Sequence, residues 1–83
     1  MSYYVYILTC KDQTLYTGIT TDLQKRVQEH NESDKGAKYT RVRRPVELSY
    51  SEQALNRSEA SKREYAIKKL TRAQKLELIY SSS

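Results

Sequence analysis

The chain has 83 residues, which is enough for one small domain with a single sheet and a few helices. One cysteine excludes an internal disulfide, and one cysteine with one histidine excludes a zinc site built from such ligands. A net charge of +5 favours a polyanionic partner such as nucleic acid, although the same charge would also serve solubility alone.

A lone cysteine favours a reducing compartment, so we expect a cytoplasmic protein. The N-terminal stretch Met-Ser-Tyr-Tyr-Val lacks the basic flank and the apolar run of a signal peptide. No apolar stretch approaches the roughly 20 residues that span a bilayer. We therefore expect a soluble protein with no membrane partner, in which 1–83 is one domain and 81–83 are a loose end.

Two strands are predicted near the N-terminus. Residues 3–10 are almost continuously apolar and rich in Tyr, Val and Ile, which is typical of a central strand buried on both faces. Residues 11–14 are polar and residues 15–20 resume a β-branched and aromatic pattern, so the two segments predict a hairpin. The turn has no Asn-Gly or Asp-Gly signal that would fix its register.

Three helices are predicted from capping boxes, in which a polar N-cap is followed three residues later by Gln or Glu. The boxes are Thr21-Asp-Leu-Gln24, Asn56-Arg-Ser-Glu59 and Thr71-Arg-Ala-Gln74. They predict helices that run to about residue 31, from residue 57 to about 70, and from residue 72 to about 80.

The segment between the first two helices is predicted to contain a third strand. Residues 31–38 form a polar loop, and residues 39–44 fit a short helical turn before Pro45. Residues 46–51 alternate apolar and polar side chains, which is typical of a half-buried strand. The resulting order, β-β-α-(short helix)-β-α-α, predicts the α+β class: a three-stranded antiparallel sheet flanked by helices.

The first helix places Leu23, Val27 and His30 on one stripe, with Arg26 beside them. Arg26 and His30 are one turn apart, so both side chains can approach the same point. Each also has an ordinary alternative: Arg26 can extend its head into water, and the helix dipole favours a histidine near a helix C-terminus.

The second long helix carries Glu64 at the margin of its apolar side, and Arg63 falls inside that side. The ordinary alternative for Glu64 is a solvated glutamate in an i,i+4 pair with Lys68. The residues predicted to form the apolar side are Ala60, Ala66, Ile67 and Leu70. In the last helix, the residues predicted to be buried are Ala73, Leu76, Ile79 and Tyr80.

The hairpin and the two helices together resemble the GIY-YIG nuclease family. The first motif corresponds to Val5-Tyr6-Ile7, with Tyr4 where the family has its glycine, and the second to Tyr16-Thr17-Gly18, with Thr17 in place of Ile. The match is specific because Arg26, His30 and Glu64 follow in the family's order. The chain looks most like small stand-alone bacterial members, including the stretch 36–41, and like the nuclease domain of the repair enzyme UvrC.

The resemblance implies a GIY-YIG fold and an endonuclease that hydrolyses phosphodiester bonds, in DNA more than in RNA, with a role in repair or recombination. It implies that Glu64 binds one divalent metal, Mg²⁺ or Mn²⁺, that Tyr6 or Tyr16 helps to deprotonate water, and that Arg26 stabilises phosphate charge. His30 matches a position near the reacting groups, and Gly18 is structural. The polar residue, often Asn, that follows the glutamate in relatives has no match in the mostly apolar stretch 76–79.

The likeliest nucleic-acid contacts lie in the loop before Pro45. A basic cluster with an interleaved tyrosine can meet phosphates and stack on a base. Its residues are Lys38, Tyr39, Arg41, Arg43 and Arg44. A solvated basic surface is the alternative, and at the level of function a nuclease-like module that binds nucleic acid or protein without cutting remains open.

The tyrosines of the hairpin divide between the two faces of the sheet, because side chains alternate along a strand. Tyr3 and Tyr4 are left to packing. If Tyr6 and Tyr16 both serve one site, they must lie on the same face, with Tyr6 across from Gly18 or from a position two residues away.

Overall fold

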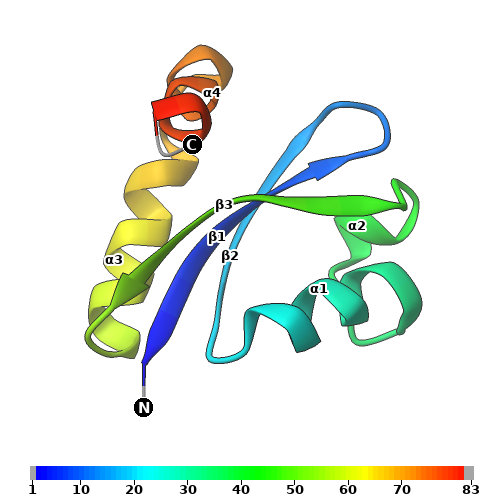
Figure 1. The fold of residues 1–83 in the computed structure, drawn as a ribbon, viewed down its shortest axis with the longest axis horizontal. Coiled ribbons are helices and arrows are strands. Elements are labelled where there is room, and N and C mark those ends of the chain that lie inside the picture. The colour runs from blue at the N-terminus through cyan, green and yellow to red at the C-terminus, as the bar shows by residue number, and fades with distance from the viewer. Residues whose placement is uncertain (1, 82–83) are drawn as a thin grey trace.

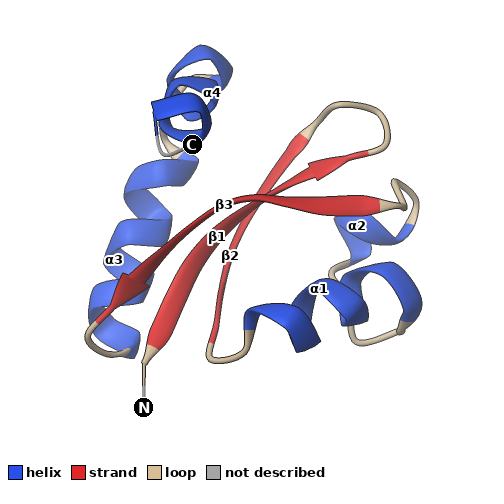
Figure 2. Cartoon of the chain, in the orientation of Figure 1, coloured by secondary structure: helices blue, strands red, loops and turns tan. Residues whose placement is uncertain are grey.

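The computed structural model describes residues 2–81 and has the predicted order of elements (Figures 1 and 2). The elements are β1 (Tyr3–Cys10), β2 (Leu15–Thr20), α1 (Leu23–Glu32), α2 (Lys38–Arg41), β3 (Val46–Ala54), α3 (Arg57–Lys68) and α4 (Arg72–Ser81). No helix within the described residues has the length and apolar character needed to cross a membrane.

The three strands form one antiparallel sheet in the order β2-β1-β3, so the most apolar strand is central, as its sequence predicts. Opposite β2, Tyr6 pairs with Gly18 and Leu8 pairs with Tyr16. Opposite β3, the register shifts between Ile7 and Leu8, which marks a bulge in the partner strand. β3 continues to Ala54, beyond the predicted end at residue 51.

Each face of the sheet is covered by its own helices (Figure 1). Val5 and Ile7 point to one face and pack with Ala60 and Ile67 of α3 in a core of fully buried side chains. Residues on the opposite face pack against Leu23 and Val27 of α1, and they are Tyr6, Leu8, Cys10 and Val46. Alternation along β1 therefore builds two small cores on one thin sheet.

The helix starts are those predicted, except that α1 begins one residue later. Its N-cap is Asp22, whose carboxylate accepts from the Lys25 N–H at 3.1 Å, and not Thr21. The Asp22 N–H is itself held by the Thr20 hydroxyl at 3.1 Å, which places Asp22 at the cap. At α4 the predicted reciprocal box forms, with Thr71 and Gln74 bonding each other's backbone N–H groups.

Several predicted boundaries and buried faces were wrong in detail. Ala66 and Ala73 are exposed, Tyr80 is 70% exposed, and Leu78 rather than Ala73 packs on the core. Ser81 belongs to α4, while the other two residues of the predicted loose end lie outside the described residues. Helical spacing alone misplaced these residues because both helices bury only a narrow stripe against the small sheet.

Gly18 is required by the close approach of the Tyr6 ring. A Cβ at this position would lie 2.5 Å from the Tyr6 hydroxyl and 2.6 Å from Cζ, and the Tyr6 side chain is too buried to move aside freely. We expect Gly18→Ala to lower the free energy of unfolding by about 1–3 kcal/mol, measured by chemical denaturation. In a Tyr6→Leu background the same substitution should cost clearly less; equal costs in both backgrounds would contradict this account.

Candidate active site

Tyr6 lies at the centre of the candidate site. Its ring extends over Gly18 of β2, and its hydroxyl lies 2.9 Å from Nε2 of His30 on α1. The sequence-based condition for a shared site is met, because Tyr6 and Tyr16 lie on the same face of the sheet. The two rings both contact His30 edge-on, with ring centroids 5.9 Å and 5.2 Å from it.

His30 is fully buried near the end of α1 and bonds through both ring nitrogens. Nδ1 lies 2.7 Å from the hydroxyl of Thr40, and this hydroxyl donates to the Ala37 carbonyl at 2.9 Å. Because the hydroxyl proton is committed to the carbonyl, the Thr40 oxygen accepts from His30, and we assign the ring proton to Nδ1. The Ala37 N–H also approaches Nδ1, but its distance of 3.5 Å is too long to compete with the Thr40 bond. Nε2 is then an acceptor, and the Tyr6 hydroxyl donates to it.

Burial moves the pKa values of this pair apart. Desolvation lowers the pKa of His30 to about 4, and the nearby positive charge of Arg26 acts in the same direction. Desolvation also raises the pKa of Tyr6 to about 12, while Arg26 partly offsets this rise. In the free protein the proton therefore stays on Tyr6 and the imidazole stays neutral.

The C-terminal end of α1, which carries His30, is tied firmly to its surroundings. Asn31 bonds both backbone groups of Val46, accepting from its N–H at 2.7 Å and donating to its carbonyl at 3.0 Å. Arg44 donates at 2.6 Å to each of the carbonyls of His30 and Ser33. These bonds satisfy carbonyl groups that a helix end leaves without partners, so the position of the imidazole is fixed.

Arg26 stands one turn before His30, as its spacing predicts, and is partly exposed. Its Nη1 donates to Glu29 Oε1 at 3.0 Å and to the Lys35 carbonyl at 2.8 Å. The guanidinium thus has a fixed location beside the phenol of Tyr6, whose pKa it lowers. It presents a permanent positive charge at the mouth of the site.

Tyr16 connects the site to the basic loop. Its ring stacks on Tyr39 with centroids 6.0 Å apart and an interplanar angle of 25°, and the Arg43 guanidinium lies 3.9 Å from the centre of the Tyr39 ring. Arg43 also forms an ion pair with Asp12 at 3.0 Å. The column of Arg43, Tyr39 and Tyr16 therefore ends on His30.

The predicted nucleic-acid contacts are not equivalent in the structure. Lys38 and Arg41 are exposed on α2, although Arg41 also donates to the Asp34 carbonyl at 3.0 Å. Tyr39 and Arg43 belong to the stacked column. Arg44 bonds the end of α1, so its geometry indicates a structural role.

Glu64 approaches the site from the other layer of the fold. It lies on α3, which covers the opposite face of the sheet, and its side chain is 24% exposed and 3.4 Å from Lys68 Nζ. Its negative charge nevertheless acts on Tyr6, as the smallest of the influences that set the phenol pKa. The i,i+4 pair foreseen as the ordinary alternative is therefore present, at the margin of the candidate site.

A divalent cation at this site would have few protein ligands. Within residues 2–81, no three His, Cys, Asp or Glu side chains are grouped closely enough to hold a metal. A single half-buried carboxylate is a hard oxygen donor that leaves most coordination positions to water and phosphate, which fits Mg²⁺ or Mn²⁺. Glu64 therefore suits a cation that is bound together with a phosphodiester.

Sequence reasoning missed Thr40 as a member of the site. Thr40 is fully buried and is the hydrogen-bond partner of His30 Nδ1. The sequence signal for Thr40 was its place in the stretch 36–41, which resembles the small members of the family. Spacing across a loop does not show which residue bonds a buried histidine.

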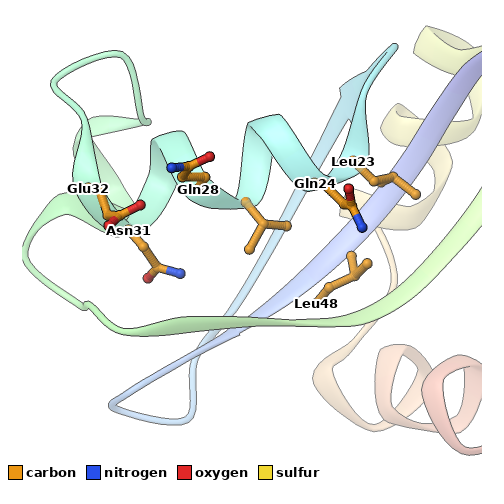
Figure 3. A pocket seen from close by; sticks show the side chains of 7 residues that line it. Leu23, Gln24, Gln28, Asn31, Glu32 and Leu48 are labelled. Carbon is orange, nitrogen blue, oxygen red and sulfur yellow. The ribbon is translucent and has the colours of Figure 1, made fainter.

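A separate groove of about 560 Å³ lies between α1 and β3 (Figure 3). The residues that line it are Leu23, Gln24, Val27, Gln28, Asn31, Glu32 and Leu48. None of the candidate catalytic residues is among them, so the hollow is not the chemical centre.

The buried neutral imidazole predicts a loss of stability in mild acid. The pKa of His30 is about 4 in the folded protein and about 6.5 when unfolded, so the unfolded state binds more protons between these values. We expect the free energy of unfolding to fall by up to about 3 kcal/mol from pH 6.5 to pH 4, and to be unaffected by this group above pH 7. Chemical denaturation of wild type and His30→Gln at pH values across this range tests the prediction. The same change of unfolding free energy with pH in both proteins would contradict it.

Thr40→Val should disturb His30 without changing the volume of the side chain. The variant leaves the Nδ1 proton of a buried ring without an acceptor, which should cost about 1–3 kcal/mol of stability. Nitrogen chemical shifts of the imidazole should show Nδ1 protonated in wild type and in Thr40→Ser, and an altered tautomer balance in Thr40→Val. Protonation of Nε2 in the wild type would overturn the assignment.

Comparison with known families agrees with the sequence-based resemblance. The family model of the GIY-YIG catalytic domain matches residues 2–77. A UPF0213 protein of Desulfotalea psychrophila is 58% identical over 81 residues, which are 98% of this chain and 74% of the relative. A UPF0213 protein of Clostridium perfringens is 61% identical over 80 residues, with 96% and 85% covered.

Solved structures show the same fold. A solution NMR structure of a protein from E. faecalis has 47% identity and a TM-score of 0.66, covering 98% of this chain and 85% of its own. The NMR structure of a UPF0213 protein from Bacillus halodurans has 46% identity and a TM-score of 0.61, covering 96% and 84%. The chain is a member of the GIY-YIG domain family, in its small UPF0213 branch.

Proposed function

We propose that the protein is a metal-dependent endonuclease that hydrolyses phosphodiester bonds in DNA, with branched or damaged DNA of repair or recombination as its substrate. The observation that carries the proposal is the hydrogen-bonded chain from Tyr6 through His30 to Thr40, with Tyr16 and Arg26 beside it. A surface that only binds nucleic acid does not need a buried series of hydrogen bonds of this kind. Membership of a nuclease family indicates the reaction that these hydrogen bonds would serve.

The geometry favours Tyr6 over Tyr16 as the residue that takes a proton from water. A phenol is a weak base unless its own proton can leave, and the neutral Nε2 of His30 is positioned 2.9 Å away to receive it. Proton transfer from water to Tyr6 and from Tyr6 to His30 then leaves hydroxide as the nucleophile. The negative phosphodiester would favour the imidazolium that results, and Arg26 would stabilise charge on the phosphate.

Divalent metals are general among GIY-YIG nucleases, and Glu64 would hold the ion here. When bound, the cation would neutralise charge that develops on the phosphate. The pair between Glu64 and Lys68 does not prevent this, because an i,i+4 pair on a helix contributes only about 0.3–0.5 kcal/mol. Lys68 would then be free to contact a phosphate.

A binding module without catalysis is the second candidate. The pKa of about 12 for Tyr6 keeps its proton in place in the free protein, and the stretch 76–79 lacks the polar residue common in relatives. A protein of this kind would bind nucleic acid in a salt-dependent way and show no turnover with any metal.

Cleavage assays distinguish the two candidates. Purified protein is incubated with Mg²⁺ or Mn²⁺ and labelled single-stranded, duplex, flap and four-way DNA. We expect cleavage that falls by about 100-fold or more in Tyr6→Phe, since proton transfer contributes about this factor, and that is lost in Glu64→Gln.

The matched control is Glu59→Gln, because Glu59 lies on the same helix and also pairs with a lysine, Lys62, at 3.6 Å. This variant should cleave like the wild type. Equal cleavage by wild type and Glu64→Gln would show that the activity comes from elsewhere, and binding without cleavage of any substrate would favour the second candidate.

A further inference from the structure

The two flanks of α3 differ in how their cations are paired. Ala60 and Ile67 face the sheet, and helical spacing places Arg63 at one margin of this buried stripe and Glu64 at the other. On the first flank the positive charges are neutralised. Arg63 donates to Glu52 at 2.8 Å, and Lys62, on the side of α3 away from the sheet, lies 3.6 Å from Glu59.

The flank that carries Glu64 has a different balance of charge. Within residues 2–81, the ion pair of this flank joins Lys68 to Glu64 at 3.4 Å. Lys69 follows on the side of α3 that faces away from the sheet, and it forms no ion pair with a described residue. If Glu64 binds a cation, Lys68 loses its acidic partner as well. The Glu64 flank is therefore the one with a surplus of positive charge.

The same positive surface continues onto α4 and reaches the strand that bears Tyr16. Arg72 and Lys75 line a small hollow of about 130 Å³ together with Thr14 and Leu15, at the start of β2. α4 follows α3 on the same side of the sheet (Figure 1). Leu15 and Tyr16 are neighbours on the edge strand β2 but point to opposite faces, so these cations lie across the sheet edge from Tyr16.

An exposed aromatic ring lies on this surface. Tyr65 is 63% exposed, and the ammonium of Lys69 lies 4.4 Å from the centre of its ring. Tyr39 on the other side of the site already uses its ring against both Arg43 and Tyr16, so Tyr65 is the more open of the two platforms. A cation and an open ring together suit the phosphate and the base of one nucleotide.

We infer that Tyr65, Lys68, Lys69, Arg72 and Lys75 form a second nucleic-acid contact, the α3–α4 surface, which binds a single-stranded segment of the substrate beside the bond to be cut. Its cations contact phosphates, and Tyr65 stacks on an unpaired base. The strand must be single there, because neighbouring bases cover both faces of a base inside a duplex. The inference rests on the proposed function, since it assigns the substrate's path at that site.

Binding without a metal tests the surface independently of cleavage. Fluorescence anisotropy with labelled oligodeoxythymidine in EDTA, from about 50 to 200 mM salt, gives the slope of affinity against salt. For Lys69→Ala combined with Lys75→Ala, we expect the slope to fall by about 1.4, which corresponds to two phosphate contacts on a single strand. Lys62→Ala removes a cation that is already paired with Glu59, so it should change the slope clearly less than the double variant.

Tyr65→Ala should weaken binding of the single strand by about fivefold to 100-fold, with Tyr65→Phe close to wild type and duplex binding nearly unchanged. Wild-type affinity and slope in both the double variant and Tyr65→Ala would overturn the inference, even if the protein cleaves DNA. If these losses of binding occur but no metal supports cleavage, the results support the α3–α4 surface and contradict the proposed nuclease activity.

Discussion

The close approach of the Tyr6 ring to Gly18 is the constraint on which the rest of the site depends. With no side chain at residue 18, the ring can lie across the neighbouring strand, and its hydroxyl reaches a helix that follows later in the chain. His30 and Thr40 extend this contact to α1 and α2. The missing Cβ at residue 18 therefore lets β1, α1 and α2 share one series of hydrogen bonds.

Burial fixes the positions of the hydrogen-bonded side chains but disfavours proton transfer from Tyr6 to His30. A buried phenol and a buried imidazole both prefer to be neutral, which separates their pKa values and holds the proton on Tyr6. Arg26 does not remove this barrier, because its charge favours the phenolate and disfavours the imidazolium. A phosphodiester brings the opposite charge, so binding of an anion is the event that would make proton transfer to His30 less costly.

The sequence was sufficient for the fold because periodicity and capping residues agreed, although the hairpin turn carried no signal of its own. β1 could be placed at the centre from its continuous apolar run, and the shared face of Tyr6 and Tyr16 followed from alternation along the strands. The errors on the buried side of α4 and the length of β3 fell where tertiary packing decides, whereas the N-cap of α1 was set by a local bond from Asp22 to Thr20. Thr40 and the structural bonds of Arg44 could not be foreseen, because both depend on how a loop folds back on α1.

The position of β2 at the edge of the sheet explains how groups from two layers can serve one centre. Helices on opposite faces of a central strand are kept apart by the sheet between them. Beyond an edge strand nothing separates them. Tyr6 reaches over β2 from the α1 face, while α3, which carries Glu64, and the cations Arg72 and Lys75 lie against β2 from the other. A nucleic acid laid along this edge would meet the relay on one side and the positive surface on the other, so a three-stranded domain has room for both chemistry and binding.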